Sequence, residues 1–415
     1  PEKIRKQIAN KIKNKNCYNI GNRKAAIKTS ILNADSNEII LVAGKGHEDE
    51  QIYKNKIIKT SDKKIIKNLK IKLKKISNKN QNFKQNQNIL NSIYKRKKLK
   101  NFHGIAIDTR LIKKDNLFLT IKGKNHDGKN FITKALKKGA KYIISSKNNV
   151  NHNKKIIKVV NELKFLNTFA LKKRNSSRAT ILGITGSAGK TSLKNLIFQL
   201  LQTYGPALCS PKSYNNHYGV PLSLSNLNFN HKYGIFEVGM SRKGEINKLS
   251  KLIKPHIAII TNIGEAHIEN FKNLKGIAKA KSEIITNIKK GGTLILNHDD
   301  AYYRYLKNKA DRSNIKVVTF GFSKKSQIYP VMIAKNKKNT KLKIKVNNQI
   351  LKLVIKNINI YNVLSSIALL NELNLDLNKI IKNFKNFEPT EGRGKIHSIK
   401  RYKKNFKLID ESYNA

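Results

Sequence analysis

The stretch ITGSAGKTS, residues 184–192, joins the apolar run 179–184 to the helix-like segment 193–201. A strand, a glycine-rich turn and a helix that opens with Lys-Thr form a cradle for phosphate, because backbone N–H groups and the positive end of the helix dipole face the turn. In such a loop Lys190 reaches the terminal phosphates and the Thr191 hydroxyl ligates magnesium. The stretch therefore predicts a nucleotide site.

The glycine spacing departs from the common phosphate loop. The general pattern has a glycine five residues before Gly189, where this chain has Ile184, and the upstream glycine is Gly186 instead. A variant loop of this kind leaves several classes of nucleotide enzyme open. Its predicted phosphate-side residues are Gly186, Ser187, Gly189, Lys190, Thr191 and Ser192.

The net charge suggests a polyanionic partner, but its distribution argues against one. The 415 residues include 86 Lys and Arg against 25 Asp and Glu, which gives a formal charge of +61. Such a charge is typical of proteins that bind nucleic acid or anionic membranes. Here, however, the lysines run along almost the whole chain, mixed with abundant Asn and Ile. Because these residues share A/T-rich codons, a drift in DNA composition explains the excess, and we expect no specific nucleic-acid partner.

Cysteine count and hydropathy favour a protein of the reducing cytoplasm. Cys17 and Cys209 provide neither a disulfide framework nor a metal set. No apolar run of about 18 residues exists, and the N-terminus lacks a signal-peptide pattern. We therefore expect a soluble, cytoplasmic monomer without a membrane span that acts on small molecules. The chain begins at Pro1 and stops at Ala415 just after a strand-like run, so we expect both ends to be cut from a longer protein.

Composition and hydrophobic periodicity divide the chain into five segments. The second segment is rich in Lys, Asn and Gln, which predicts a solvated linker, although anion binding by its basic cluster 95–98 stays open. The predicted segments are 1–75, a partial α/β domain; 76–100, the linker; 101–175, a small α/β domain; 176–388, the central phosphate-loop domain; and 389–415, a hinge and the beginning of a further domain.

Apolar runs predict the strands of both α/β domains. In the small domain they fall at 104–107, 117–121 and 142–145, with a helix at 131–138 and a hinge at 172–177 at its end. Alternation of strands and helices predicts a mostly parallel central sheet covered by helices on both faces. Its expected strands are 179–184, 233–238, 256–261, 293–297 and 315–320, followed by a hairpin of 342–346 and 350–355 and a helix at 360–373.

Carboxylates at other strand ends are needed to bind the magnesium of a nucleotide. Glu237 ends the strand-like run 233–236, where a side chain at the carboxyl edge of a parallel sheet faces the phosphate loop. His267 follows the next strand, although a lone histidine is more often structural. Lys279 and Lys281 lie on the following helix, and by composition alone they are solvated lysines.

Six blocks in order along the chain resemble the Mur ligases. They are TGSAGKTS (185–192), YNNHYGVPLSL (214–224), FEVGMSRKGEI (236–246), TNIGEAHIENF (261–271), AKAKSEI (278–284) and DESYNA (410–415). A further block, 105–140, is similar to the family's UDP-sugar-binding domain, so the resemblance covers about residues 101–415. It implies an α/β multidomain architecture in which a central ATPase domain of mostly parallel sheet follows a small α/β UDP-sugar-binding domain.

The resemblance is strongest to the peptidoglycan-precursor ligases that use ATP and Mg²⁺ to join D-alanyl-D-alanine (D-Ala-D-Ala) to UDP-N-acetylmuramoyl-tripeptide (UDP-MurNAc-tripeptide). It implies that Lys190 and Thr191 bind the ATP phosphates and magnesium, and that Glu237 and His267 hold magnesium ions. Lys281 matches the family's modified lysine, so it would be carbamylated and become a magnesium-binding carboxylate. ATP would phosphorylate the tripeptide carboxylate, and the dipeptide amine would attack the acyl phosphate.

Other matched positions imply contacts with the nucleotide and the substrate. Asn359 and Asn362 match a nucleotide-side motif, although Ile358 stands where the family carries His. Arg393 and Asp410 match hinge residues that reach the nucleotide. The residues that would contact substrate are Asp108, Thr109 and Arg110 in the small domain, and Asn215 and Asn216 in the second block.

The N-terminal segment has a resemblance of its own. Residues 22–51 resemble the C-terminal domain of the Mur ligase that adds the third peptide residue, and Gly44 and Glu48 in its GKGHE block would contact that residue, unless the block is a simple turn. We therefore expect a fusion of two ligases. Because the domain that binds the dipeptide would follow Ala415, we expect this fragment to bind ATP and UDP-sugar but to ligate poorly or not at all.

Three alternatives remain open at this point. Another phosphate-loop NTPase would hydrolyse nucleotide without any UDP-linked peptide. A basic nucleic-acid-binding protein would bind in a strongly salt-dependent way. Another amide ligase of the same superfamily, similar to the ligase of the third peptide residue or to folylpolyglutamate synthase, would share the ATP site. The identity of the third peptide residue, diaminopimelate or lysine, is also left open.

Overall fold

The computed structural model divides the chain into two compact units, residues 1–81 and 82–415, which are described separately. The structure describes residues 7, 20, 22–33, 50–53, 56–59, 61–94, 99–123, 126–146, 155–336, 339–389, 392–393, 395–401, 404–410 and 412.

In its described residues, the first unit contains two helices and a hairpin. An ion pair of 2.6 Å joins Arg23 to Asp62 at the beginnings of the two helices. The GKGHE block, with Gly44 and Glu48, lies outside the described residues. The elements are α2 (Arg23–Asn33), β1 (Glu50–Tyr53), β2 (Lys56–Lys59) and α3 (Asp62–Ile93), of which the last continues into the second unit.

The expectation of a solvated linker at 76–100 was wrong for its second half. Helix α3 extends to Ile93, and Leu90 and Leu99 are buried together with Phe102 in the core of the small domain. The polar side chains have partners, because the Asn86 amide donates to the backbone carbonyl of Phe102 at 3.2 Å. Amides that bond to buried carbonyls let a segment of polar composition pack as well as an apolar one.

The small domain is a parallel sheet between helices. Its strand order is β3-β4-β5-β6, and the predicted strands are confirmed, while the three-residue β6 was missed because its apolar run is short. The predicted hinge at 172–177 was wrong in part, since α5 includes residues 172–175 and buries Lys173. The elements are β3 (Ile105–Ala106), β4 (Leu117–Leu119), α4 (Ile132–Lys137), β5 (Tyr142–Ser145), β6 (Ile156–Lys158) and α5 (Glu162–Asn175).

The central sheet has nine strands in the order β15-β14-β13-β12-β11-β10-β7-β9-β8. The pairs from β8 to β13 are parallel, and the last two pairs are antiparallel, so the predicted sheet and the hairpin around Asn347 are confirmed. The strands are β7 (Thr180–Thr185), β8 (Ala207–Cys209), β9 (Tyr233–Glu237), β10 (Ile257–Ile260), β11 (Thr293–Asn297), β12 (Lys316–Phe320), β13 (Ile328–Lys335), β14 (Thr340–Val346) and β15 (Gln349–Ile355).

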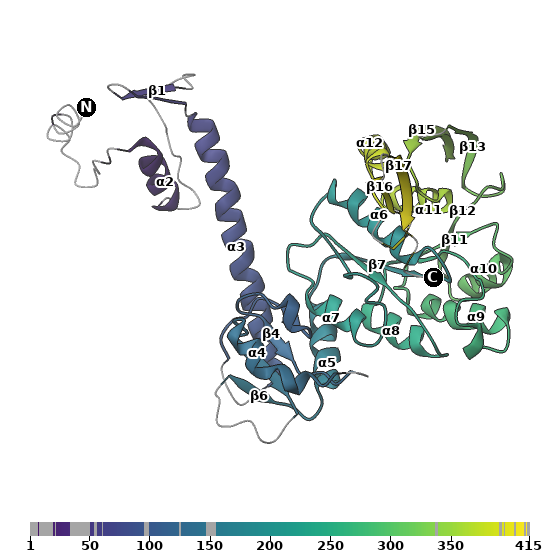
Figure 1. The fold of residues 1–415 in the computed structure, drawn as a ribbon, viewed down its shortest axis with the longest axis horizontal. Helices are drawn as coiled ribbons and strands as arrows, with labels where there is room; N and C mark the ends of the chain where they lie inside the picture. The colour runs from purple at the N-terminus through teal and green to yellow at the C-terminus, as the bar shows by residue number, and fades with distance from the viewer. Residues whose placement is uncertain are drawn as a thin grey trace. The chain divides into compact units, whose positions relative to one another are not determined.

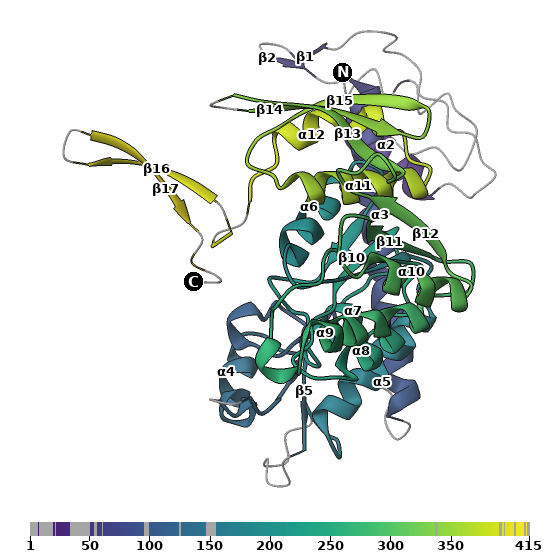
Figure 2. The same ribbon diagram turned by 90° about the vertical axis from the view of Figure 1, so that its right-hand side faces the viewer.

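Helices cover both faces of this sheet, as the alternation predicts. Figures 1 and 2 show α6 and α11 on one face and α8, α9 and α10 on the other, and each face has its own apolar core. Among the described residues, no helix has the length and apolarity to cross a membrane. The helices are α6 (Lys190–Gln202), α7 (Gly219–Ser225), α8 (Glu245–Ile253), α9 (Leu274–Lys281), α10 (Tyr303–Arg312), α11 (Ile360–Glu372) and α12 (Ile381–Lys385).

A further hairpin lies near the end of the described chain. Strands β16 (Lys395–Arg401) and β17 (Lys404–Asp410) pair antiparallel. The strand-like run 406–409 is therefore a strand, and it leads into the DESYNA block, of which the structure describes Asp410 and Ser412.

A neutral histidine joins two strands of the central sheet and makes stability depend on pH. The Ile181 N–H donates to Nδ1 of His256 at 2.8 Å, so this nitrogen must carry no proton. Burial, followed by the charges of Arg174 and Lys289, lowers the pKa of His256 from 6.5 to about 4. At pH values between these two pKa values the unfolded chain thus binds more protons than the folded chain. The free energy of unfolding therefore falls as the pH falls through this range.

We expect His256→Asn to remove this part of the acid sensitivity, because the amide oxygen accepts from the same N–H and does not titrate. Between pH 7 and 4.5 the melting temperature of the unchanged chain should fall by about 2 °C more than that of the variant, which corresponds to roughly 1 kcal/mol after discounting for solvent exposure. Thermal melts in which the melting temperature of both proteins falls equally between the two pH values would contradict the assignment.

Candidate active site

The phosphate loop lies at the carboxyl edge of the central sheet, between two neighbouring strands. Strand β7 pairs with β9 on one side and β10 on the other, so both of these strands end beside the loop. Gly186 has φ 146°, and a Cβ there would lie 1.9 Å from Oγ1 of Thr261, which only glycine avoids. Gly189 has φ 80° and is the residue before α6. The variant spacing thus lets the loop pass close to the end of β10.

The donors of the loop have protein partners in this structure. The side-chain oxygen of Asn262 accepts from the N–H groups of Ser187 at 3.2 Å and Ala188 at 2.9 Å. Lys190 donates from Nζ to the carbonyl of Gly186 at 2.8 Å, and burial lowers its pKa. Phosphate oxygens can replace a neutral amide oxygen as the acceptor for these N–H groups. Sequence reasoning missed Asn262, although it stands in the TNIGEAH block.

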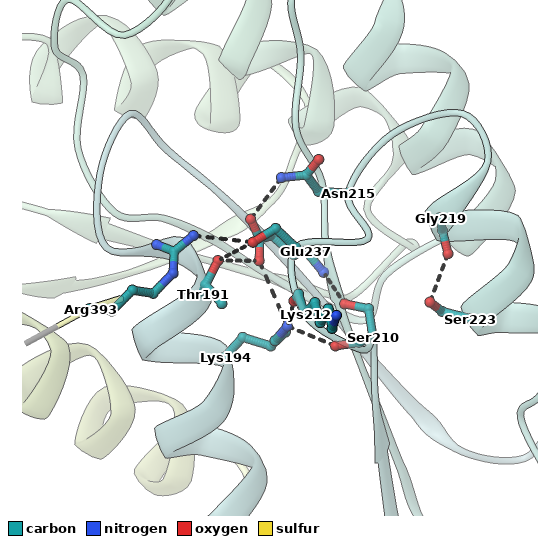
Figure 3. Close-up of polar contacts among 10 residues, drawn as sticks. Thr191, Lys194, Ser210, Lys212, Asn215, Gly219, Ser223, Glu237 and Arg393 are labelled. Carbon is teal, nitrogen blue, oxygen red and sulfur yellow. Dashed lines mark hydrogen bonds and ion pairs between the residues drawn. The ribbon is translucent and has the colours of Figure 1, made fainter. Parts of the chain in front are cut away.

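Glu237 is the centre of a polar cluster beside the loop. Only 1 % of the residue is exposed, and it pairs with Ile184 across the sheet, which confirms its predicted place at the end of a strand. Its Oε2 accepts from the Thr191 hydroxyl at 2.8 Å, and its Oε1 accepts from the Asn215 amide at 2.8 Å. Figure 3 shows these side chains meeting from α6, β9 and the segment after β8.

A cavity of about 1170 Å³ opens onto this cluster. A space of this size accommodates a large ligand with its phosphates at the loop. It brings together most of the residues that the sequence singled out. They are Gly186, Ser187, Gly189, Lys190, Thr191, Asn215, Asn216, Glu237, His267, Lys281 and Arg393.

Lys281 differs sharply from the lysine two residues before it. The structure buries Lys281 at the end of α9 with 2 % exposure, whereas Lys279 is exposed. Burial, together with the charge of Lys190, lowers the pKa of Lys281 to about 7. A substantial fraction of this amine is therefore unprotonated at neutral pH. Composition alone suggested a solvated lysine at both positions, and for Lys281 that was wrong.

His267 and Arg393 reach the same cavity from loops. His267 has φ 65°, is half-exposed and lies 3.7 Å from a carboxylate oxygen of Glu269. Arg393 donates from Nη2 to the Ser213 hydroxyl at 3.1 Å. Within the part of the chain that the structure describes, no three His, Cys, Asp or Glu side chains lie close enough to form a metal site by themselves.

A smaller cavity of about 330 Å³ shares Ala188 and Gly189 with the first. In it, the Tyr361 hydroxyl donates to Asp299 at 3.3 Å, and the Tyr361 ring packs edge-on against Phe322. Sequence reasoning missed Asp299, although it follows the end of β11 at the same edge of the sheet. The lining also includes Asn297, Asn359 and Asn362, of which the last two were predicted to lie on the nucleotide side.

Several predicted residues lie away from both cavities. Ser192 and Asp410 line neither of them, and Asp410 accepts from the Gly392 N–H at 2.7 Å. In the small domain, Asp108 caps the turn Thr109–Leu111 and forms an ion pair of 2.7 Å with Arg110. The adjoining Thr109 is buried.

A parallel sheet with a phosphate loop at its carboxyl edge defines a phosphate-loop nucleotide-binding protein. Two family models match the chain, the Mur ligase family catalytic domain at residues 101–174 and the Mur ligase middle domain at 184–370. The UDP-N-acetylmuramoyl-tripeptide–D-alanyl-D-alanine ligase of Rickettsia prowazekii is 34 % identical over 320 residues, which cover 76 % of this chain and 70 % of the relative. The chain therefore belongs to the Mur ligase family.

Other relatives agree with this assignment. The ligase of the same name from Buchnera aphidicola subsp. Baizongia pistaciae is 33 % identical and covers 75 % of this chain, which spans 68 % of that relative. Among solved structures, MurF from Acinetobacter baumannii matches with a TM-score of 0.69 at 24 % identity, covering 80 % of this chain and 73 % of that one. The MurF ligase of Thermotoga maritima in complex with ADP matches with a TM-score of 0.64 at 26 % identity. The match covers 75 % of this chain and 71 % of that one.

The first of the two family matches begins at residue 101 and the second at residue 184. The resemblance of residues 22–51 to the ligase of the third peptide residue, and with it the expected fusion, therefore stays a prediction.

Proposed function

We propose that this chain is a ligase of the MurF type, which joins D-Ala-D-Ala to UDP-MurNAc-tripeptide with ATP as the energy source. The names of the relatives support this function. The observation that carries it is the cluster of Thr191, Asn215 and Glu237 beside the phosphate loop, in a cavity that also reaches Lys281. ATP and UDP-linked substrates are compounds of the cytoplasm, where we propose that the chain acts.

The donor set fits magnesium. Mg²⁺ prefers oxygen ligands and is commonly bound by one or two carboxylates together with substrate phosphates. Glu237 supplies a buried carboxylate beside the Thr191 hydroxyl, and His267 lines the same cavity. When bound, the metal neutralises charge on the transferred phosphoryl group. A carbamylated Lys281 would add a second carboxylate, since its unprotonated amine can attack CO₂, forming an N–C bond and releasing a proton.

The first step proposed is phosphoryl transfer. A carboxylate oxygen of the tripeptide attacks the γ-phosphorus of ATP, an acyl phosphate forms, and ADP leaves. Lys190 and the loop N–H groups would bind the phosphates by exchanging their present protein acceptors for phosphate oxygens. Asn359 and Tyr361 of the smaller cavity would contact the nucleoside. Arg393, joined to Ser213, would reach the phosphates from the C-terminal segment.

The second step forms the amide. The amine of the dipeptide attacks the acyl carbon, phosphate leaves, and the nitrogen loses a proton. Asn215 and Asn216 line the large cavity on the substrate side, and the Asn216 oxygen also caps α7 through the Gly219 N–H at 2.9 Å. We propose that residues 101–175, with Asp108, Thr109 and Arg110 on one turn, bind the UDP-sugar, because block 105–140 resembles the UDP-sugar-binding domain of the family.

The test isolates the first step, which does not need the dipeptide. The 415-residue chain is incubated with ATP, Mg²⁺ and UDP-MurNAc-tripeptide, and hydroxylamine traps the acyl phosphate as a hydroxamate. ADP release and hydroxamate should appear together, and only when the UDP-linked tripeptide is present. ADP release that is independent of this substrate would instead favour a general phosphate-loop NTPase.

A further inference from the structure

A second lysine of α6 is completely buried behind the phosphate loop. Lys194 follows Lys190 by one helical turn, but it has 0 % exposure and does not line the large cavity. Its Nζ donates to the carbonyl of Ser210 at 2.7 Å and to the carbonyl of Lys212, and lies 3.8 Å from Oε2 of Glu237 (Figure 3). The two carbonyls accept from the ammonium group, and the Glu237 carboxylate, which lies beyond hydrogen-bond distance, balances its charge.

These partners of Lys194 belong to two elements that form the site, the segment 210–216 and strand β9. The segment 210–216 carries Ser213, whose hydroxyl lies 3.3 Å from that of Thr191, and Asn215, which donates to Glu237. It is tied to β9 as well, because the Glu237 N–H donates to the Ser210 hydroxyl at 3.2 Å. One ammonium group therefore connects α6, segment 210–216 and the end of β9.

The backbone of segment 210–216 needs such a contact. Lys212 has φ 44°, in the left-handed region that residues other than glycine seldom adopt. A conformation of this kind persists only where the surroundings impose it. The bond from Lys194 to the Lys212 carbonyl, together with the adjacent bond to Ser210, provides this constraint.

A lysine at this position is not explained by packing. Met has a similar length and would fill an apolar space without burying a charge, which is unfavourable unless the charge has partners. Lys173 is a buried lysine of the same chain that lies outside the site. It is 1 % exposed, and its ammonium bonds to amide oxygens, those of Gln85 at 2.7 Å and Asn86 at 2.6 Å, and does not line the large cavity.

We propose that Lys194 is a positioning residue for the metal–nucleotide complex. It maintains Glu237 and segment 210–216 in the arrangement in which Thr191, Ser213 and Asn215 meet, and it does not itself touch phosphate. This inference rests on the proposed function, since it concerns the residues that would bind Mg²⁺ and ATP.

The test compares ATP binding by calorimetry in the presence of Mg²⁺ and in EDTA. Lys194→Met should weaken binding of Mg·ATP by about tenfold or more, the size of effect seen when groups that orient metal ligands are removed. Binding of ATP in EDTA should change by less than about threefold, because it does not depend on Glu237 as a ligand. Lys173→Met is the matched control, a buried lysine outside the site, and should bind Mg·ATP like the unchanged chain.

A third variant separates positioning from space filling. Lys194→Arg keeps the charge and the donors but fits the volume worse than Met, so it should lose less Mg·ATP affinity than Lys194→Met. The reverse order, or an unchanged affinity in Lys194→Met, would overturn the proposal. If Lys194→Met shows no cooperative thermal transition, Lys194→Gln takes its place, and wild-type affinity in that variant overturns the proposal equally. An unchanged chain that binds no Mg·ATP would refute the proposed function itself.

Discussion

Replacing Glu237 with glutamine is expected to lower the rate of acyl-phosphate formation by roughly 10³-fold, the upper range for removing one preorganised charged or polar group from a transition state. Glutamine has nearly the same shape, so the fold of β9 should be unaffected. It lacks the charge that would bind magnesium, and it leaves the buried Lys194 ammonium without the carboxylate 3.8 Å away. ATP binding in EDTA should persist, because the loop residues remain in place.

The chain offers a matched control in Glu372. This partly buried carboxylate also accepts from a threonine hydroxyl, that of Thr293 at 2.8 Å, and pairs with a lysine, Lys316. It lies outside the large cavity. Hydroxamate formation should therefore stay within about twofold of the unchanged rate in Glu372→Gln, as for substitutions away from a site. A Glu237→Gln variant that behaves like the Glu372→Gln variant would exclude Glu237 from the chemistry.

Lys281→Ala should lower the same rate by roughly 10²- to 10³-fold if the modified lysine supplies a second carboxylate to the metal. The exposed Lys279, on the same helix, is the control, and Lys279→Ala should be nearly unchanged. Because alanine leaves a cavity where the carbamate would lie, a small carboxylate such as formate should restore part of the activity of Lys281→Ala. Mass spectrometry under CO₂ should detect the carbamate on the unchanged chain.

Rescue by formate separates two roles for Lys281. If the lysine instead acted as a cation near the phosphates, against the effect of burial and of the Lys190 charge on its pKa, formate would not help and a small amine would. A Lys281→Ala variant that forms hydroxamate at the full rate would exclude Lys281 from the chemistry.

Local patterns in the sequence predicted much of the central domain. Continuous apolar runs mark strands that are buried on both faces, which is why 293–297 and 233–238 agree with β11 and β9 to within one residue. The order of loop, strand and acid also predicted that Glu237 would lie beside the phosphate loop. The expected linker failed because composition does not reveal that the Asn86 amide bonds to a buried carbonyl or that Leu90 packs in a core.

By itself, the sequence determined the phosphate loop, the alternation of strands and helices, and the family to which the chain belongs. These depend on neighbouring residues, whose spacing sets the period of a strand or helix and the shape of a turn. Only the tertiary structure decided which side chains meet. Thr191 and Glu237 are 46 positions apart, and Lys281 is a solvated lysine by composition but a buried one by position. Whether a side chain is buried, and which residues it contacts, depends on the packing of elements that are far apart in the sequence. A local pattern therefore does not reveal it.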